Sequence, residues 1–176
     1  MRIITGKYKG RHFDIPRTFK ARPTTDFAKE NIFNVLTQYV DFDGADALDL
    51  FSGTGSITLE LLSRGCRRVV SVEMDRDHHR FIVDCVKKLG DEGCLPLRGD
   101  VFRFLKSCKA QFDFIFADPP YALKELATIP DIVFERQLLS DDGIFVFEHG
   151  KDHSFEAHPH FVEHRQYGSV NFTLFR

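Results

Sequence analysis

Four consecutive residues, Asp118-Pro119-Pro120-Tyr121, have the groups needed to hold a flat base that carries an exocyclic amine. Proline fixes φ and has no N–H, so two prolines in a row make a stiff loop whose carbonyls point in set directions. We expect the Asp118 carboxylate and the Pro119 carbonyl to accept amine hydrogens, and Tyr121 to stack on the ring. Asp and Pro are also common turn residues, so the stretch alone is equally compatible with an ordinary turn.

The elements that position this loop follow from the apolar pattern. From residue 46 onward, short apolar runs alternate with helical segments, which predicts right-handed βαβ units and a mostly parallel sheet covered on both faces. The predicted strands are 45–50, 68–73, 94–98, 112–117 and 143–147, and the predicted helices lie near 56–64, 75–89, 101–106 and 124–138. A predicted C-terminal hairpin, 161–167 with 170–175, adds an antiparallel strand.

A second group of candidate residues lies in the segment LDLFSGTG, residues 48–55, where the first of these strands ends. Gly53 and Gly55 let the backbone turn sharply and approach a ligand closely. Glu73 ends the next strand, where a carboxylate suits ribose hydroxyls. A GxGxxG dinucleotide fingerprint would need a third glycine where this chain has Thr58. The pattern therefore also suits a nucleoside cofactor that has no pyrophosphate.

A sulfonium nucleoside such as S-adenosyl-L-methionine has an amino acid tail, a ribose and an adenine to be bound. We expect Asp49 to meet the ammonium of the tail, Asp100 to lie near the adenine amino group, and Val101 to give the adenine an apolar edge. Asp100 is also suited to capping the next helix. Open α/β sheets bind ligands at the carboxyl ends of their strands. The predicted cofactor contacts are Asp49, Phe51, Gly53, Thr54, Gly55, Glu73, Met74, Asp100 and Val101.

The N-terminal segment is basic. Residues 1–30 contain eight Lys or Arg and three Asp or Glu, a net charge of +5, so the other 146 residues carry −7 of the total of −2. A basic arm is expected where a segment meets phosphate, although a solvated tail explains it equally well. Residues 2–15 predict a short hairpin. Thr24 or Thr25 is expected to cap a helix with apolar positions Phe27, Ile32, Phe33, Val35 and Leu36.

Length and composition restrict the class of protein. A chain of 176 residues that is 43% hydrophobic and 28% charged predicts one globular domain with a sizeable core. No apolar run approaches the roughly 20 residues that span a bilayer, and no signal-peptide pattern is present. The four cysteines form no CxxC pair, so we expect reduced thiols and a cytoplasmic location. The five histidines between 149 and 164 lack metal-site spacing and are expected in a solvated loop, with no metal bound.

With LDLFSGTG, VEMD, GDV and ADPPY in this order, the chain resembles Rossmann-like class I S-adenosylmethionine-dependent methyltransferases. Four further motifs narrow the resemblance to the RsmD family, the bacterial 16S ribosomal RNA guanine-N2 methyltransferases: GKYKGR (6–11), RPTTDFAKENIFN (22–34), LLSRG (61–65) and YG (167–168). The resemblance implies a seven-stranded α/β sheet whose last strand is antiparallel. It also implies that the substrate is a guanine of 16S rRNA, within an assembling small ribosomal subunit in preference to naked RNA.

We divide the chain into an N-terminal RNA-binding extension, residues 1–40, and a methyltransferase domain, residues 41–176, and expect a monomer. The extension would hold phosphates near the base pocket, with Arg11 and Arg22 as the strongest candidates. Thr24 is better suited to capping its helix. The full set of predicted RNA contacts is Lys7, Lys9, Arg11, Arg22 and Thr24.

Three other functions remain open at this point. An adenine-N6 DNA methyltransferase is the nearest enzymatic rival, because the same loop serves that amine, but it usually needs a target-recognition region for which 176 residues leave no room. A glutamine-N5 protein methyltransferase usually carries Asn where this chain has Asp118. A non-catalytic RNA-binding assembly factor could keep the cofactor fold, although intact Asp118 and Glu73 argue against such decay.

Overall fold

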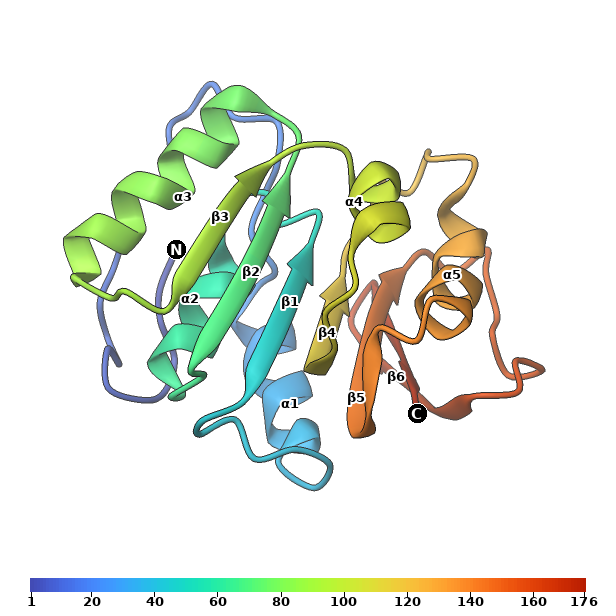
Figure 1. Ribbon diagram of the computed structural model, residues 1–176. Helices are drawn as coiled ribbons and strands as arrows, with labels where there is room; N and C mark the ends of the chain where they lie inside the picture. The colour runs from blue at the N-terminus through green and yellow to red at the C-terminus, as the bar shows by residue number, and fades with distance from the viewer.

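The computed structural model describes residues 1–176, and at its centre is a seven-stranded sheet (Figure 1). The strand order is β3-β2-β1-β4-β5-β7-β6, with β1 to β5 parallel and β7 antiparallel to both of its neighbours. The strands are β1 (Asp46–Leu50), β2 (Arg68–Glu73), β3 (Cys94–Arg98), β4 (Phe112–Ala117), β5 (Leu139–His149), β6 (Phe161–Tyr167) and β7 (Val170–Phe175). The predicted fold class, with its antiparallel C-terminal strand, is confirmed.

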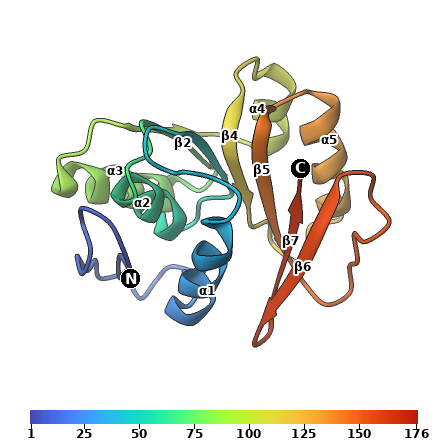
Figure 2. The same cartoon turned by 90° about the horizontal axis from the view of Figure 1, so that it is seen from below.

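Helices cover both faces of the sheet, as Figure 2 shows from below. One face carries α1 (Asp26–Leu36), α2 (Ser56–Ser63) and α3 (Arg76–Leu89), which form one hydrophobic core with the sheet. The other carries α4 (Val101–Ser107) and α5 (Ile129–Glu135), which form a second core. Because the central strands are buried on both faces, they are mostly Val, Ile, Leu and Phe, interrupted within β2 by Ser71 and within β4 by Asp113. No helix is long and apolar enough to cross a membrane.

The register of the central strands brings their carboxyl ends together at one edge. Leu50 at the end of β1 pairs with Ala117 at the end of β4, and Ala117 pairs in turn with Phe147 of β5. Side chains alternate between the two faces of a sheet. Residues at these strand ends therefore meet at the carboxyl edge of the sheet.

The N-terminal segment is fixed to α2 by buried charges. Lys29 of α1 is only 1% exposed, and its Nζ donates to Arg2 O (2.7 Å) and Ser56 Oγ (3.0 Å) and lies 3.5 Å from Glu60 Oε1. The fully buried Glu60 accepts the Ile4 amide on Oε1, and the Thr5 amide and Arg64 on Oε2. Removing one partner of a buried ion pair is strongly destabilising. Residues 1–40 therefore share a core with the sheet and pack directly on it.

Several local predictions are wrong in detail. The expected 2–15 hairpin is present only in part: it contains a single bridge, Arg2–His12, and backbone hydrogen bonds that join residues 1–3 to residues 10–13. Its middle does not continue the pairing, because the chain around Gly6 folds onto Ser63 at the end of α2. Thr25, not Thr24, caps α1, with its hydroxyl accepting from the Ala28 amide (3.2 Å).

Other errors concern Phe27 and the region from residue 124 onward. Phe27 in the first turn of α1 is 62% exposed instead of buried. The helix expected over 124–138 is a short 3₁₀ turn, Leu126–Thr128, followed by α5, since Pro130 is accommodated only in the first turn of a helix. Strand β5 then begins earlier than predicted, because Leu139 pairs with Phe112.

Candidate active site

A cavity of about 870 Å³ lies at the carboxyl ends of the central strands. That volume is within the usual range for small-molecule sites. It is lined by residues that follow β1, β2, β3, β4 and β5 and by the segment that leads into α1. Of the predicted cofactor and base-binding residues, the cavity is lined by Asp49, Phe51, Gly53, Thr54, Glu73, Met74, Asp100, Val101, Asp118, Pro119 and Tyr121. Gly55 does not line it.

The loop after β1 is shaped by its glycines. Gly53 has a φ of +56° and Gly55 a φ of +82°, in the left-handed region that favours glycine. A Cβ on Gly55 would lie 2.9 Å from Ile82 Cγ1, so α3 packs closely against this turn. Phe51 also has a positive φ, 59°, which is uncommon for a residue with a side chain. Gly55 therefore allows α3 to pack against the loop on the side away from the cavity, whereas Gly53 lines the cavity.

Asp49 lies beneath this loop and is almost completely buried. Its Oδ2 accepts from Thr58 Oγ1 (2.6 Å), which is part of a chain of hydroxyls with Ser71 and Ser52. Burial raises the pKa of Asp49 to about 7, hydrogen bonds from Thr58 and Ser52 lower it, and the nearby charge of Asp118 raises it. Only hydroxyl and backbone donors reach the carboxyl. The site therefore holds an acidic group that lacks a positive partner.

Glu73 and Asp100 are held in place by backbone amides. Glu73 Oε1 accepts from the Gly53 amide (2.8 Å) and its Oε2 from the Asp75 amide (2.7 Å), which ties the end of β2 to the loop after β1. Asp100 lines the cavity and also caps α4 by accepting from the Arg103 amide (3.0 Å). Both carboxylates are therefore fixed at the rim before any ligand binds.

The loop after β4 forms the opposite wall of the cavity. The Asp118 amide donates to Leu50 O (3.3 Å), which fastens the start of the loop to the end of β1. Pro119 is buried, whereas Tyr121 is 51% exposed and its hydroxyl donates to Glu148 Oε1 (3.4 Å). Glu148 follows the residue of β5 that pairs with Ala117, so it lies beside Asp118.

Asp118 and Glu148 form a tightly coupled pair of carboxyls. They lie side by side, and each affects the pKa of the other. Burial raises the pKa of Asp118 well above its usual value, and the charge of Glu148 and the shared hydrogen bond raise it further. Burial also raises the pKa of Glu148, against the lowering effect of its hydrogen bonds to Asp118 and Tyr121. Two like charges this close cannot both ionise easily, so the two carboxyls titrate as a pair.

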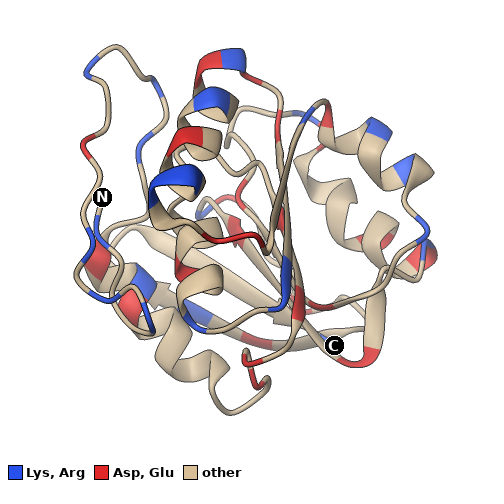
Figure 3. Ribbon diagram, turned by 60° about the vertical axis from the view of Figure 1, so that its left-hand side comes forward, with Lys and Arg blue, Asp and Glu red and all other residues tan.

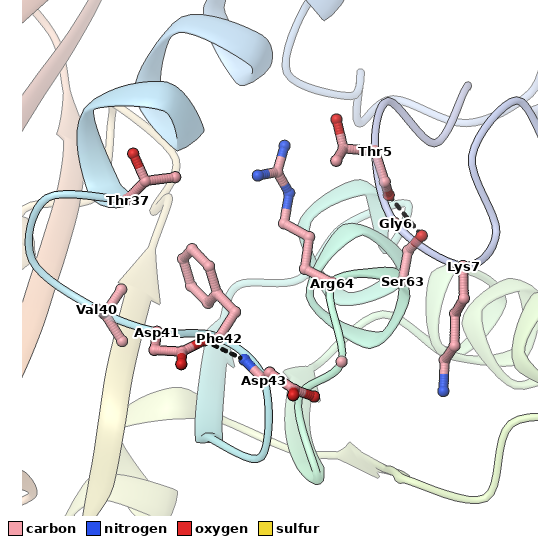
Figure 4. A pocket seen from close by; sticks show the side chains of 11 residues that line it. Thr5, Gly6, Lys7, Thr37, Val40, Asp41, Phe42, Asp43, Ser63 and Arg64 are labelled. Carbon is pink, nitrogen blue, oxygen red and sulfur yellow. Dashed lines mark hydrogen bonds between the residues drawn. The ribbon is translucent and has the colours of Figure 1, made fainter.

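The five residues predicted to bind RNA fall into two groups. Arg22 and Thr24 line the large cavity, together with Lys20. Lys7, Lys9 and Arg11 belong to a stretch that lies near the ends of α2 and α3, because the Lys7 amide donates to Ser63 O and Arg11 donates to Lys88 O. Figure 3 marks the Lys and Arg positions along the ribbon in blue. Lys7 lines a separate hollow beside Ser63 and Arg64, as Figure 4 shows. Because α2 has 8 residues, this hollow is about 12 Å along the helix from the loop after β1.

Sequence reasoning missed three residues of the cavity and its support. Glu148 ends an apolar strand and carries no motif of its own. Thr58 occupies the position of a missing glycine, and its hydroxyl holds Asp49. His78, which belongs to α3 and carries no motif, lines the cavity and packs edge-on against Phe19 with ring centroids 4.5 Å apart.

The histidines between 149 and 164 are not a solvated cluster. His149 is buried and its ring nitrogens lie 2.7 Å from Thr173 Oγ1 and 2.8 Å from Gly150 O. His158 pairs with Asp131, and the ring of His160 stacks on Phe134. His149 and His158 therefore act as packing groups, whereas His160 and His164 are exposed, as expected for a solvated segment.

A mostly parallel sheet with an antiparallel C-terminal strand and a cavity at its carboxyl edge is the architecture of the Rossmann-like class I methyltransferase fold. The fold matches that of Thermus thermophilus RsmC, described as a 16S rRNA N2 G1207 methyltransferase in complex with AdoMet and guanosine. The match has a TM-score of 0.71 and 19% identity, and covers 90% of this chain and 44% of RsmC.

The chain belongs to the family described as Conserved hypothetical protein 95, whose model matches residues 1–176. It is 36% identical over 156 residues to Bacillus subtilis YlbH, provisionally named an rRNA methyltransferase, covering 86% of this chain and 84% of YlbH. It is 30% identical over 156 residues to the ribosomal RNA small subunit methyltransferase D of Haemophilus influenzae, covering 86% of this chain and 80% of that protein. The resemblance to the RsmD family is confirmed.

Proposed function

We propose that this protein transfers a methyl group from S-adenosylmethionine to the exocyclic N2 of a guanine in small-subunit (16S) ribosomal RNA. One observation carries the proposal. The Asp118–Tyr121 loop and the carboxylates of the cofactor side line the same cavity, and Asp118 is close enough to Asp49 for its charge to raise the Asp49 pKa. A methyl donor and a planar amine would therefore meet in one site.

The cavity fits S-adenosylmethionine. Asp49 is a buried carboxyl with no cation beside it, which suits the ammonium of the amino acid tail. Glu73 suits the ribose hydroxyls, and Asp100 with Val101 suits the adenine. Phe51, Gly53, Thr54 and Met74 complete the cofactor wall, and Gly55 shapes it from beneath. When bound, the cofactor supplies an electrophilic methyl group, and the electron pair of the broken carbon–sulfur bond returns to sulfur.

Asp118 and Pro119 prepare the nucleophile. The N2 lone pair of guanine is delocalised into the ring, so the amine must be held in the geometry of attack. The Asp118 carboxylate accepts one N2 hydrogen and the Pro119 carbonyl the other. As the nitrogen–carbon bond forms, positive charge develops on N2, and Asp118 stabilises it and then takes the N2 proton.

Tyr121 receives the base at the cavity mouth. Its ring is half-exposed and held by the hydroxyl contact to Glu148, so a face is open for stacking. Such stacking contributes roughly 1–3 kcal/mol per base. A base inside a helix cannot reach this loop, so the target guanine must be unpaired or flipped out of its stack.

Residues 1–40 supply the RNA contacts in this proposal. Arg22 and Thr24 lie at the cavity and would touch RNA next to the target base. Lys7, Lys9 and Arg11 would touch phosphates farther away. The partner is 16S rRNA within an assembling small subunit, the enzyme acts as a monomer in the cytoplasm, and residues 41–176 form the catalytic domain.

The test is labelled methyl transfer to small-subunit particles from a strain that lacks this protein, followed by nucleoside mass mapping. We expect one N2-methylguanosine in 16S rRNA. N6-methyladenosine would move the enzyme to the adenine class. Cofactor binding without methyl transfer to any RNA would support a non-catalytic assembly factor instead.

A further inference from the structure

Glu148 has an unusual environment for a buried carboxylate. It is 6% exposed, lines the large cavity, and lies beside Asp118. Its Oε1 accepts from the Tyr121 hydroxyl, whereas its Oε2 is buried with no partner other than the neighbouring Asp118 carboxyl. Buried polar atoms are nearly always hydrogen-bonded, so an orphaned acceptor in a ligand cavity marks a place for a donor.

The two oxygens of Glu148 are not equivalent. The Tyr121 hydroxyl donates to Oε1, so Oε1 faces the tyrosine. Oε2 is therefore the oxygen that remains to accept from a ligand group beside Asp118. A base stacked on Tyr121 with its amine on Asp118 therefore presents the next atom of its edge to Glu148. The sheet sets the spacing between the two carboxylates, because Ala117 pairs with Phe147, and Asp118 and Glu148 are the residues that follow them.

Guanine is the nucleobase whose edge matches this arrangement. Its N2 amine has two hydrogens, and the adjacent ring atom N1 carries a third. Adenine presents its N6 amine next to a bare N1, which is an acceptor and would be repelled by a carboxylate. We propose that Glu148 Oε2 accepts the guanine N1–H and so selects guanine over bases whose adjacent ring nitrogen is bare.

This assignment rests on the proposed function and deepens it, since it names a residue that contacts the substrate base. It separates two tasks within the carboxyl pair. Asp118 accepts from the reacting N2, and Glu148 reads the neighbouring atom. A structural role for Glu148 is disfavoured, because a carboxylate that only supported the fold would have its Oε2 satisfied by the protein.

The decisive test combines a substrate that lacks the N1 hydrogen, and with it O6, with a variant that reverses the polarity at Oε2. 2-Aminopurine keeps the exocyclic amine of guanine but has a bare N1. In Glu148→Gln, the Tyr121 hydroxyl holds the amide oxygen at the Oε1 position, so the amide N–H₂ replaces Oε2. That variant donates where the wild type accepts, and it should therefore clash with guanine N1–H and pair with the bare N1 of 2-aminopurine.

The experiment uses small-subunit particles reconstituted with 16S rRNA that carries guanine or 2-aminopurine at the mapped target position. We expect the wild type to prefer guanine in kcat/KM by at least about tenfold. Glu148→Gln should lose at least about tenfold on guanine and reduce or invert the preference. Glu163→Gln is the matched control, since Glu163 also accepts from a tyrosine hydroxyl but lies on β6 outside the cavity.

The outcomes separate the two proposals. If the wild type methylates no guanine in these particles, the proposed function is overturned and this inference with it. If the wild type methylates guanine and 2-aminopurine equally, or Glu148→Gln lowers both rates by the same factor, only the role of Glu148 is overturned. The wild-type ratio does not depend on any variant folding, and retained S-adenosylhomocysteine binding by Glu148→Gln shows that its cofactor wall is intact.

Discussion

The two walls of the cavity differ in how completely their polar groups are satisfied. On the cofactor wall, both oxygens of Glu73 accept backbone amides, Asp100 caps α4, and a hydroxyl holds Asp49. On the base wall, the carboxyls of Asp118 and Glu148 lie side by side, and one buried oxygen, Glu148 Oε2, has no hydrogen-bond partner. The first wall is complete without a ligand, and the second becomes complete only when donors arrive.

This difference indicates two ways of binding. A wall with its hydrogen bonds already made is preorganised and needs no rearrangement to receive the cofactor. Two buried carboxyls of like charge destabilise the base wall when no ligand is bound. A bound amine that donates several N–H groups to them offsets that destabilisation. We therefore expect substitutions on the two walls to separate cofactor affinity from turnover.

The largest separation is expected for Asp118→Ala. Turnover should fall by at least about 100-fold, because the variant cannot hold the amine or accept its proton. Affinity for S-adenosylhomocysteine should change little. Calorimetry and labelled methyl transfer on the same preparation measure both quantities. Asp142→Ala, an exposed aspartate at the other end of β5, is the control. Retained turnover in Asp118→Ala would remove its catalytic role.

The converse is expected for Asp49→Asn. Loss of the buried negative charge should weaken S-adenosylmethionine binding by roughly 10- to 100-fold, the range of a hydrogen bond to a charged group. Turnover at saturating cofactor should change much less. The measurement is cofactor affinity by titration, compared with Asp46→Asn, which alters the same residue type at the start of the same strand. Equal affinities in the two variants would contradict an ammonium contact at Asp49.

A pH profile should sharpen the comparison on the base wall. Asp118 must be ionised to act, and burial together with Glu148 raises its pKa. Turnover should therefore be lost as pH falls through that raised pKa, well above the usual aspartate value of about 3.9. Glu148→Gln removes a negative charge, so the midpoint of kcat should move to lower pH. An unchanged midpoint in this variant would show that the two carboxyls do not titrate together.

The smallest effect is expected at the cavity rim. Arg22→Ala should weaken RNA binding several-fold and reduce the slope of log affinity against log salt by about 0.9, the value for one phosphate contact. Cofactor affinity should stay the same, since Arg22 is exposed and makes only local contacts to backbone carbonyls. Filter binding to small-subunit particles over a salt series gives the slope. If Arg11→Ala weakens RNA binding to the same extent, RNA contacts the protein both at the cavity and near Arg11. If neither variant weakens RNA binding, the RNA-binding role of residues 1–40 is contradicted.

The central sheet could be predicted closely because its signals are local. Arg68–Glu73, Cys94–Arg98 and Phe112–Ala117 have the predicted bounds, since each is a short apolar run between clear breaks. The residues gathered at the cavity were predictable too, because the carboxyl ends of parallel strands share one edge. What each of them does chemically stays a prediction.

The errors arise where neighbours in space decide. Glu148 looks like an ordinary strand end, and only the pairing of Ala117 with Phe147 shows that it lies beside Asp118. The 2–15 segment pairs as a hairpin only near its ends, because Glu60 and Ser63 of α2 accept the amides of Ile4, Thr5 and Tyr8 in its middle. Phe27 fits a helical apolar pattern, yet its face of α1 meets solvent.

The buried contacts of Glu60 change what a truncation experiment on this protein can mean. The amides of Ile4 and Thr5 complete its hydrogen bonds, and Lys29 neutralises its charge from within the same core. A chain trimmed by its first few residues would leave a carboxylate stranded inside the molecule. Inactivity of such a chain would report a defect in folding. RNA binding by the N-terminal segment is therefore tested with point substitutions at exposed Lys9 or Arg22 and not with deletions.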